Sequence, residues 1–321
     1  MKVVIIVLFV LLGLYIILSL ALFLLACRRF RGNRVPSAAT DNSTDKAWKK
    51  FSDVIKPGIE WFKAQEKEPV EIRSFDGLTL RASVLPAENS KGILIVFHGY
   101  RSSPMRDLGA SVKYYHGLGY TLVLPCQRAC GESDGKYICF GVKERRDVQA
   151  WARWAAGRYP DAPIALAGIS LGASSVLMAL GLEMPKNVRA AVADCGYGSI
   201  YEELKCVLKK FFGLPPQPLL GTVDLWCRLF AGFSIHDCDV PEILRKNTIP
   251  VLFFHGEADD FVPTRFSREN YDACTAPKAI LTVPEASHGL SYLVDTEGYH
   301  RELEAFLDKY CTVKGENHVE K

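Results

Sequence analysis

The chain has 321 residues, a formal net charge of +3 and 49% hydrophobic residues. Its length is suited to one large α/β domain with an appendage. A charge balance this close to zero does not suggest a nucleic-acid-binding protein, so no nucleic-acid partner is expected. The ten cysteines are scattered and form no close C-x-x-C pair, which favours free thiols over a zinc site or a disulfide framework.

The N-terminal segment is the most apolar part of the chain. No charged residue occurs in residues 3–26. As a helix this stretch would reach roughly 36 Å, enough to cross a hydrocarbon core of ~30 Å. The apolar region of a cleavable signal peptide is only about 7–15 residues long, and no small-x-small cleavage site follows here. Residues 1–34 are therefore predicted to be a single transmembrane anchor with a basic flank.

Flanking charge predicts the orientation of this anchor. Lys2 precedes the apolar stretch, and four arginines follow it: Arg28, Arg29, Arg31 and Arg34. The positive-inside tendency therefore places the rest of the chain in the cytoplasm. Alternatively, Leu24-Leu25-Ala26-Cys27 loosely resembles a bacterial lipobox, and a Cys27 lipidated after cleavage would place the rest of the chain outside. The long apolar stretch and the adjacent arginines argue against that alternative.

Residues 35–67 are predicted to be a linker followed by an amphipathic helix. The stretch 33–45 is polar and rich in turn-forming residues. Four apolar residues then recur at helical spacing with lysines between them: Trp48, Phe51, Val54 and Ile55. This basic helix is predicted to end near Pro57-Gly58. It either lies on anionic lipid headgroups or docks on the folded domain.

From about residue 68 the pattern is that of an α/β domain. Residues 70–75 and 78–84 flank Asp76-Gly77, which is a strong hairpin signal. Buried-strand patterns then alternate with helical ones, at residues 92–97, 120–124, 164–167, 188–194, 249–254 and 279–283. This alternation predicts a mostly parallel sheet with right-handed crossovers and helices on its faces. Residues 68–321 are therefore assigned to one domain.

The motif that carries chemistry is the pentapeptide Gly168-Ile169-Ser170-Leu171-Gly172, between a strand pattern and an apolar helical pattern. In this context G-x-S-x-G acts as a nucleophile elbow. The serine sits on a strained turn, and side chains at the two glycine positions would collide with the neighbouring strand and helix. Ser170 is therefore the candidate nucleophile. The alternative is a plain Gly/Ser turn between a buried strand and a helix.

A serine hydroxyl needs a general base to become a nucleophile, and the base needs an orienting group. Two later strand patterns each lead into suitable residues. The segment His255-Gly256-Glu257-Ala258-Asp259-Asp260 follows one of them, and Ser287-His288-Gly289 follows the other. The chain order of serine, acid and histidine is that of α/β-hydrolases. Because the carboxyl ends of parallel strands meet at one sheet edge, these residues are expected to meet there.

A further strand pattern, residues 92–97, leads into His98-Gly99-Tyr100. In the α/β-hydrolase fold the loop after this strand supplies one backbone N–H of the oxyanion hole. The residue after the nucleophile supplies the other. The amides of Tyr100 and Leu171 are therefore assigned to the oxyanion hole, a role in which their side chains matter little.

Together these segments resemble the α/β-hydrolase superfamily, and in particular bacterial membrane-anchored serine hydrolases similar to serine aminopeptidases and prolyl-oligopeptidase-like enzymes. The resemblance covers about residues 70–311. It implies that Asp259, the fifth residue of an H-G-x-x-D-x-x-V-P pattern, forms a catalytic triad with Ser170 and His288. Asp260 replaces Asp259 if the register of the loop differs by one.

The chain departs from the family pattern in the loop that follows residues 120–124. Cys126 and Cys130 stand where the family has aspartate and histidine. Neither position belongs to the triad, so the chemistry is expected to survive the change. The hydrogen bonding of this loop, however, must differ from that of the family.

The alternation of strands and helices breaks at about residues 196–247, where two apolar helical faces flank a proline-rich turn. Helices inserted here commonly form a cap in this fold, and an apolar cap would favour an acyl or aromatic substrate. Alternatively, the two faces pack on the sheet. Three acids of this region are candidates to bind a substrate amine, although such residues are more often surface charges: Glu202, Glu203 and Asp224.

The resemblance implies a serine hydrolase that cleaves a carboxylic ester, thioester or amide bond through an acyl-enzyme intermediate, with no metal or organic cofactor. The expected partners are a small acyl or peptide substrate and a lipid membrane, the latter contacted through the N-terminal helix. Two other functions remain open. One is a peptidase similar to the serine aminopeptidases, and the other is an acyltransferase or non-catalytic member of the same fold.

Overall fold

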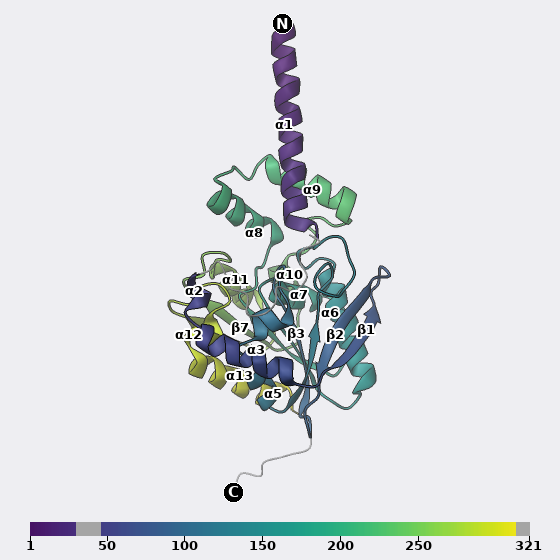
Figure 1. Cartoon of the computed structure of the whole chain (residues 1–321), viewed down its shortest axis with the longest axis vertical. Helices are drawn as coiled ribbons and strands as arrows, with labels where there is room; N and C mark the ends of the chain where they lie inside the picture. The colour runs from purple at the N-terminus through teal and green to yellow at the C-terminus, as the bar shows by residue number, and fades with distance from the viewer. Residues whose placement is uncertain (30–45, 313–321) are drawn as a thin grey trace.

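The computed structural model describes residues 1–29 and 46–312. Arg31, Arg34 and the predicted linker at residues 33–45 lie outside the described residues. The described part is a twisted sheet with helices on both faces, from which one long helix, α1 (Lys2–Cys27), projects at one end (Figure 1). The C-terminal end of the described chain lies at the opposite end of the molecule.

Among the described residues the sheet contains eight strands, in the order β1-β2-β4-β3-β5-β6-β7-β8. β1 and β2 form the hairpin predicted around Asp76-Gly77, and β2 also pairs antiparallel with β4. All other pairings in the sheet are parallel. The predicted α/β-hydrolase architecture is therefore confirmed. The strands are β1 (Glu68–Arg73), β2 (Thr79–Leu85), β3 (Gly92–Phe97), β4 (Tyr120–Pro125), β5 (Ile164–Ile169), β6 (Val188–Asp194), β7 (Val251–Gly256) and β8 (Lys278–Val283).

Helices cover both faces of the sheet. Ile93 and Ile95 of β3 pack in the layer formed by α6, α7, α10 and α11, whereas Leu94 and Val96 pack in the layer of α3, α4, α5 and α13. Because successive strand side chains point to opposite faces, a continuously apolar strand fills both layers. The helix bounds are α4 (Pro104–Leu108), α5 (Val112–Gly117), α6 (Glu144–Arg158), α7 (Leu171–Ala179), α10 (Val240–Leu244), α11 (Arg265–Ala273), α12 (Ser291–Val294) and α13 (Thr296–Tyr310).

The amphipathic segment forms α2 (Lys46–Lys49) and α3 (Ser52–Ala64), and it docks on the domain. Ile59 and Phe62 of α3 are each only 5% exposed, and the apolar side chains of α2 pack against the loop after β8. The prediction that this helix ends near Pro57-Gly58 is wrong. The missing N–H of Pro57 weakens the helix, but the burial of Ile59 and Phe62 beyond it offsets that loss.

A helical cap lies beside the C-terminal half of α1 (Figure 1). It consists of α8 (Ile200–Val207), η1 (Leu208–Phe212), α9 (Leu219–Trp226) and η2 (Cys227–Ala231), inserted between β6 and α10. The hydroxyls of Tyr15 and Thr222 are 2.5 Å apart. Trp226 Nε1 donates a hydrogen bond to Ser19 Oγ at 3.0 Å. The apolar helix α1 is therefore packed on the cap along its last turns, and its length and composition would allow it to cross a membrane.

The C-terminal end of α1 is also bonded to the loop after β3. The last carbonyls of a helix have no partner within it. Here the hydroxyl of Tyr100 donates to the carbonyl oxygen of Ala26 at 2.7 Å. The guanidinium of Arg101 donates to the carbonyl oxygens of Leu25, at 2.6 Å, and Arg28, at 2.9 Å. The helix end is thus fixed by two side chains that adjoin the predicted oxyanion loop.

Two further contacts attach the residues at this end of α1. The guanidinium of Arg29 donates to the carbonyl oxygens of Gly131 and Ser133, both at 2.6 Å. The side chain of Cys27, the alternative lipidation site, is 1% exposed, and its Sγ lies 3.9 Å from Sγ of Cys227 in η2. The Cys27 thiol is therefore enclosed between α1 and the cap.

Candidate active site

Ser170 lies in the turn between β5 and α7, with φ 54° and ψ −117°. This conformation is strained for a residue with a side chain. A Cβ atom at Gly168 would lie 2.3 Å from the carbonyl carbon of Gly172. A Cβ atom at Gly172 would lie 2.1 Å from the carbonyl oxygen of Phe97. Only glycine fits at either position, for the steric reason that the motif suggests.

The structure brings Ser170, Asp259 and His288 together at one edge of the sheet. They follow β5, β7 and β8, which are parallel strands whose carboxyl ends meet there. His288 Nε2 lies 2.9 Å from Ser170 Oγ, and His288 Nδ1 lies 2.7 Å from Asp259 Oδ2. Such a chain of hydrogen bonds can pass the serine proton to the imidazole while the carboxylate stabilises the charged ring.

The carboxylate of Asp259 has further partners. Its Oδ1 accepts hydrogen bonds from the N–H groups of Phe261, at 2.9 Å, and Val262, at 2.8 Å. Nε2 of the buried His255 lies 3.2 Å from its Oδ2. Burial would raise the pKa of Asp259, but hydrogen bonds with His255 and His288 outweigh it and hold the pKa well below its ordinary value. Nothing in the sequence indicated this contact between His255 and the acid.

Asp260, the alternative acid, lies outside this network. Its side chain is 74% exposed, and its carboxylate pairs with Lys210 Nζ of η1 at 2.8 Å. The same ammonium group donates to the backbone carbonyl of Asp260 at 2.6 Å. Asp260 therefore connects the cap to the loop after β7, and it does not orient His288.

Tyr100 and Leu171, the residues of the two predicted oxyanion donors, line the same cavity as Ser170. Leu171 is the first residue of α7, so its amide is one of the N–H groups that have no acceptor within the helix. The side chain of Tyr100 has a role that the sequence did not indicate. The ring stacks on Phe140 with centroids 5.8 Å apart, and the hydroxyl binds the end of α1.

The loop after β4, where Cys126 and Cys130 replace the family's aspartate and histidine, is held by other groups. The backbone N–H of Gln127 donates to His98 Nε2 at 3.0 Å, and the side-chain amide of Gln127 donates to the carbonyl oxygen of His98. The hydroxyl of Ser133 donates to the carbonyl oxygen of Cys126 at 2.6 Å. Backbone and amide contacts thus position this loop in place of the two missing polar side chains.

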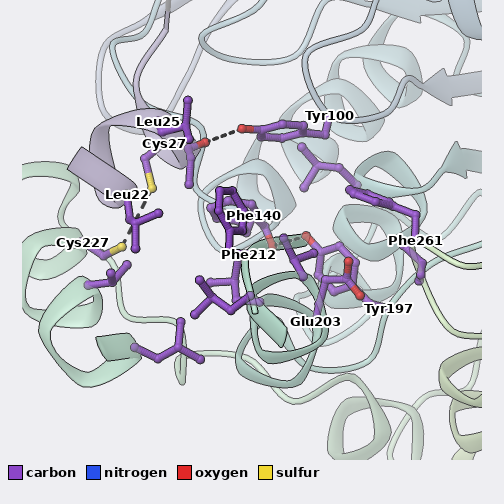
Figure 2. A pocket seen from close by; sticks show the side chains of 18 of the residues that line it. Leu22, Leu25, Cys27, Tyr100, Phe140, Tyr197, Glu203, Phe212, Cys227 and Phe261 are labelled. Atoms are coloured by element: carbon purple, nitrogen blue, oxygen red, sulfur yellow. Dashed lines mark hydrogen bonds between the residues drawn. The ribbon is translucent and has the colours of Figure 1, made fainter. Parts of the chain in front are cut away.

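A cavity with a volume of about 230 Å³ opens beside Ser170 (Figure 2). Its walls come from the strand-end loops, from the cap through Leu204 and Leu208, and from α1 through Leu22 and Leu25. The lining is predominantly apolar. The cap therefore covers Ser170, which is one of the two alternatives that the sequence left open. The contribution of α1 to this wall was not predicted.

Glu203 is the charged residue among the described residues that line the cavity. It is 5% exposed, and its Oε2 has no hydrogen-bond partner within the described structure. Burial raises the pKa of its carboxyl to about 8. The other two candidate acids lie elsewhere: Asp224 is buried within the cap and pairs with Arg228, and Glu202 pairs with Lys205. Of the three candidates, only Glu203 therefore lines the cavity, and the alternative that these acids are surface charges is wrong for Glu203 and Asp224.

A family model for X-Pro dipeptidyl-peptidases of the S15 family matches residues 32–215, more than half of the chain. The chain belongs to the S15 family. The family consists of serine hydrolases with the α/β-hydrolase fold, so this S15 protein is a hydrolase. The matched segment contains Ser170 and Glu203 and ends before Asp259 and His288.

Individual relatives and solved structures share the fold of this S15 hydrolase. The uncharacterized protein YqkD of Bacillus subtilis is 26% identical over 254 residues, which cover 78% of this chain and 82% of YqkD. An esterase of Pyrococcus furiosus is similar with a TM-score of 0.63 at 23% identity, covering 77% of this chain and 94% of the esterase. The acylaminoacyl peptidase of Pyrococcus horikoshii has a TM-score of 0.56 at 16% identity, covering 80% of this chain and 44% of the peptidase. At these identities the solved structures establish the fold alone.

One group of side chains in the described part of this S15 hydrolase has the spacing of a metal site. The ligand atoms of Cys195, Asp259 and His288 lie within 4.8 Å of one another. Two of the three already bind each other in the hydrogen-bond chain. Burial raises the pKa of the Cys195 thiol to about 11, and a protonated thiol is a poor metal ligand. The group is therefore better suited to proton transfer than to holding a cation.

Proposed function

We propose that this S15 hydrolase cleaves a carboxylic ester, thioester or amide through a triad of Ser170, His288 and Asp259. The observation that carries the proposal is the unbroken chain of two hydrogen bonds from Ser170 Oγ through His288 to Asp259. Because the pKa of Asp259 is held low, its carboxylate is charged at neutral pH and can stabilise the imidazolium form of His288.

In the first step Ser170 Oγ forms a bond to the substrate's carbonyl carbon, and its proton moves to His288 Nε2. The carbonyl oxygen becomes an oxyanion, which accepts hydrogen bonds from the amides of Tyr100 and Leu171. Such a donor stabilises the transition state by about 2.7–4 kcal/mol. The bond to the leaving group then breaks, and the leaving group takes the proton from His288. Water repeats the sequence on the acyl-enzyme and releases the acid.

The apolar cavity favours an acyl group as the part of the substrate that binds next to Ser170. Leu204, Leu208 and Phe140 offer such a group no hydrogen bonds, so a polar substrate would lose its water without compensation there. A substrate with an alkyl chain would instead gain binding free energy, because its apolar surface is buried in the cavity. We therefore expect substrates with an apolar acyl chain to be preferred, whichever of the three bond types is cleaved.

The experiment that tests this proposal is labelling of the full chain with a fluorophosphonate probe, together with hydrolysis of p-nitrophenyl butyrate. The variant Ser170→Ala should lose both activities while its thermal unfolding midpoint changes little. Ser175→Ala is the matched control, because Ser175 is a buried serine of α7, the helix that follows Ser170, and its hydroxyl donates to a backbone carbonyl. Full activity in Ser170→Ala would end the proposal.

A second candidate function is a peptidase that recognises a substrate amine, and Glu203 favours it. One carboxylate in an otherwise apolar cavity, with an oxygen that has no partner in the described structure, could bind an ammonium group. Comparing p-nitrophenyl esters of rising chain length with Gly-Pro-p-nitroanilide discriminates between the two. A peptidase should favour the anilide and lose that activity in Glu203→Gln, whereas an esterase should favour the longer esters.

We further propose that α1 spans a membrane and that the hydrolase domain lies on its cytoplasmic side. Support comes from the apolar composition of α1, from the exposure of its first turns, and from the arginines at its C-terminal end. The membrane is then a partner of this chain through α1.

A further inference from the structure

The exposed part of α1 is too short to cross a bilayer without the cap. All residues of the stretch 3–18 except Gly13 and Tyr15 are exposed, and the stretch is about 24 Å long at the helical rise. A hydrocarbon core is ~30 Å thick, so the core must extend past residue 18 toward the domain. Contacts between α1 and the cap begin at Tyr15 and Ser19, where they reach Thr222 and Trp226 of α9. If α1 spans a membrane as proposed above, part of α9 therefore lies at the depth of the lipid chains.

The cap carries the apolar surface that such a position requires. Leu225 is 49% exposed, Leu229 63% and Phe230 52%, all on α9 and η2, and Phe211 on η1 is 53% exposed. Figure 1 shows the cap on either side of the lower part of α1, at the end of the domain from which α1 projects. η1 also carries the exposed Lys209. Exposed apolar side chains with a neighbouring lysine are typical of helices at a membrane interface.

The cavity beside Ser170 reaches the surface between α1 and η1. Leu25 of α1 and Phe212 of η1 both line the cavity, yet they are 51% and 47% exposed. Figure 2 shows Leu22 and Leu25 on one side of the cavity and Phe261, which lies next to the triad, on the other. The rings of Phe261 and His288 are 5.1 Å apart. An apolar path therefore joins the lipid-facing end of the molecule to the serine.

We propose that the substrate is an acyl ester of a membrane glycerolipid, which reaches Ser170 from the bilayer between α1 and η1. This inference rests on the proposed hydrolase function and names its substrate class. The acyl chain occupies the apolar cavity, and the glyceryl oxygen is the leaving group. Ser170 Oγ bonds to the acyl carbon, the glyceryl oxygen takes the proton from His288, and water then releases a fatty acid. A chain that moves directly from lipid to an apolar wall is never exposed to water, so this route avoids the cost of hydrating it.

The test uses the full chain reconstituted in vesicles of phosphatidylethanolamine and phosphatidylglycerol that contain radiolabelled 1-oleoylglycerol. Release of oleic acid is compared with hydrolysis of the water-soluble ester p-nitrophenyl butyrate. The variant Leu225→Glu/Leu229→Glu adds charge to the lipid-facing side of the cap without touching the cavity. This variant should lower the rate of oleate release at least tenfold, while its rate of butyrate hydrolysis should stay within about twofold of the parent's. The matched control Val54→Glu/Val294→Glu, on α3 and α12, should change neither rate.

The outcomes separate the two proposals. Butyrate hydrolysis without oleate release overturns the lipid substrate and leaves the hydrolase function standing. Equal oleate release by the parent and the cap variant overturns the entry of the lipid from the bilayer between α1 and η1, and the hydrolase function again stands. Absence of both activities, with no labelling by a fluorophosphonate, overturns the hydrolase function and the lipid substrate with it. Labelling of the cap variant at the parent's level verifies that its active site is folded.

Discussion

At the scale of single residues, Asp259 and Asp260 are neighbours in the chain with opposite environments. Asp259 is buried and bonded to His288, whereas Asp260 is exposed and pairs with the cap. Replacing Asp259 with Asn should lower kcat by about 10³–10⁴-fold, because an amide neither stabilises the imidazolium nor fixes the ring's tautomer. Asp260→Asn makes the same chemical change and should leave kcat within about twofold.

Steady-state hydrolysis of p-nitrophenyl butyrate by the two variants gives the comparison directly. A larger loss in Asp260→Asn than in Asp259→Asn would mean that the loop register is displaced by one residue and that the assignment of the acid is wrong.

Glu203 should make stability depend on pH. An unfolded glutamate titrates near 4.5, whereas burial raises the pKa of Glu203 in the folded chain to about 8. Between these values the folded chain holds a proton that the unfolded chain has lost. The free energy of unfolding therefore falls as pH rises through this window. In Glu203→Gln this contribution is absent, so the variant should become more stable relative to the parent as pH rises from 5 to 8.

Thermal unfolding midpoints across that pH range test this expectation, with Glu202→Gln as the control because Glu202 is partly exposed and paired with Lys205. Parallel curves of unfolding midpoint against pH for the parent and Glu203→Gln would show that Glu203 is not a buried acid with a raised pKa.

The sequence indicates the nucleophile most directly, because the elbow of Ser170 is encoded within five residues. Asp259 and His288 follow from the chain order and the family resemblance. The sequence offers Glu203 only as one of three candidate acids, because its burial depends on how α8 packs over the sheet edge. The contact of His255 with Asp259 is not visible in the sequence, because it arises only when the chain turns back after β7.

At the scale of elements, α3 shows how packing overrides local signals. Pro57-Gly58 reads as a helix end, yet α3 continues through it because its face is buried against α4 and α5. A Cβ atom at Gly58 would lie 1.9 Å from the carbonyl oxygen of Gly109. The glycine is therefore required by the close approach of two backbones and does not mark the end of a helix. Such a requirement is invisible in a single sequence.

This contact predicts a contrast between two glycine-to-alanine changes. Gly58→Ala should lower the free energy of unfolding by about 1–3 kcal/mol, because backbone must move to admit the methyl group. Gly157→Ala, in α6 with nothing within 4 Å of its Cβ position, should raise it by up to about 1 kcal/mol through helix propensity. Thermal unfolding followed by circular dichroism in detergent micelles measures both. Equal midpoints for the two variants would contradict the packing of α3.

At the scale of the whole molecule, the opening hairpin and the mostly parallel pairing could be predicted, because hydrophobic periodicity and the alternation of strands with helices indicate them. The order of the strands in the sheet was not predicted. The contact between α1 and the active site could not be predicted from the sequence. Nothing in the apolar pattern of residues 3–26 distinguishes a helix that only anchors from one whose Leu22 and Leu25 form part of a cavity wall. That difference depends on hydrogen bonds from Tyr100 and Arg101, which are far away in the sequence.

If α1 spans a membrane as proposed, its attachment to the domain also constrains which side of the membrane holds the hydrolase domain. Arg29 binds the carbonyl oxygens of Gly131 and Ser133, so Arg29 and the domain lie on the same side. The positive-inside tendency predicts that this side is the cytoplasm. A C-terminal epitope tag should therefore resist protease added to intact spheroplasts and be digested once detergent is present. Digestion in intact spheroplasts would place the domain outside, and the substrate lipid would then have to come from the outer leaflet of the bilayer.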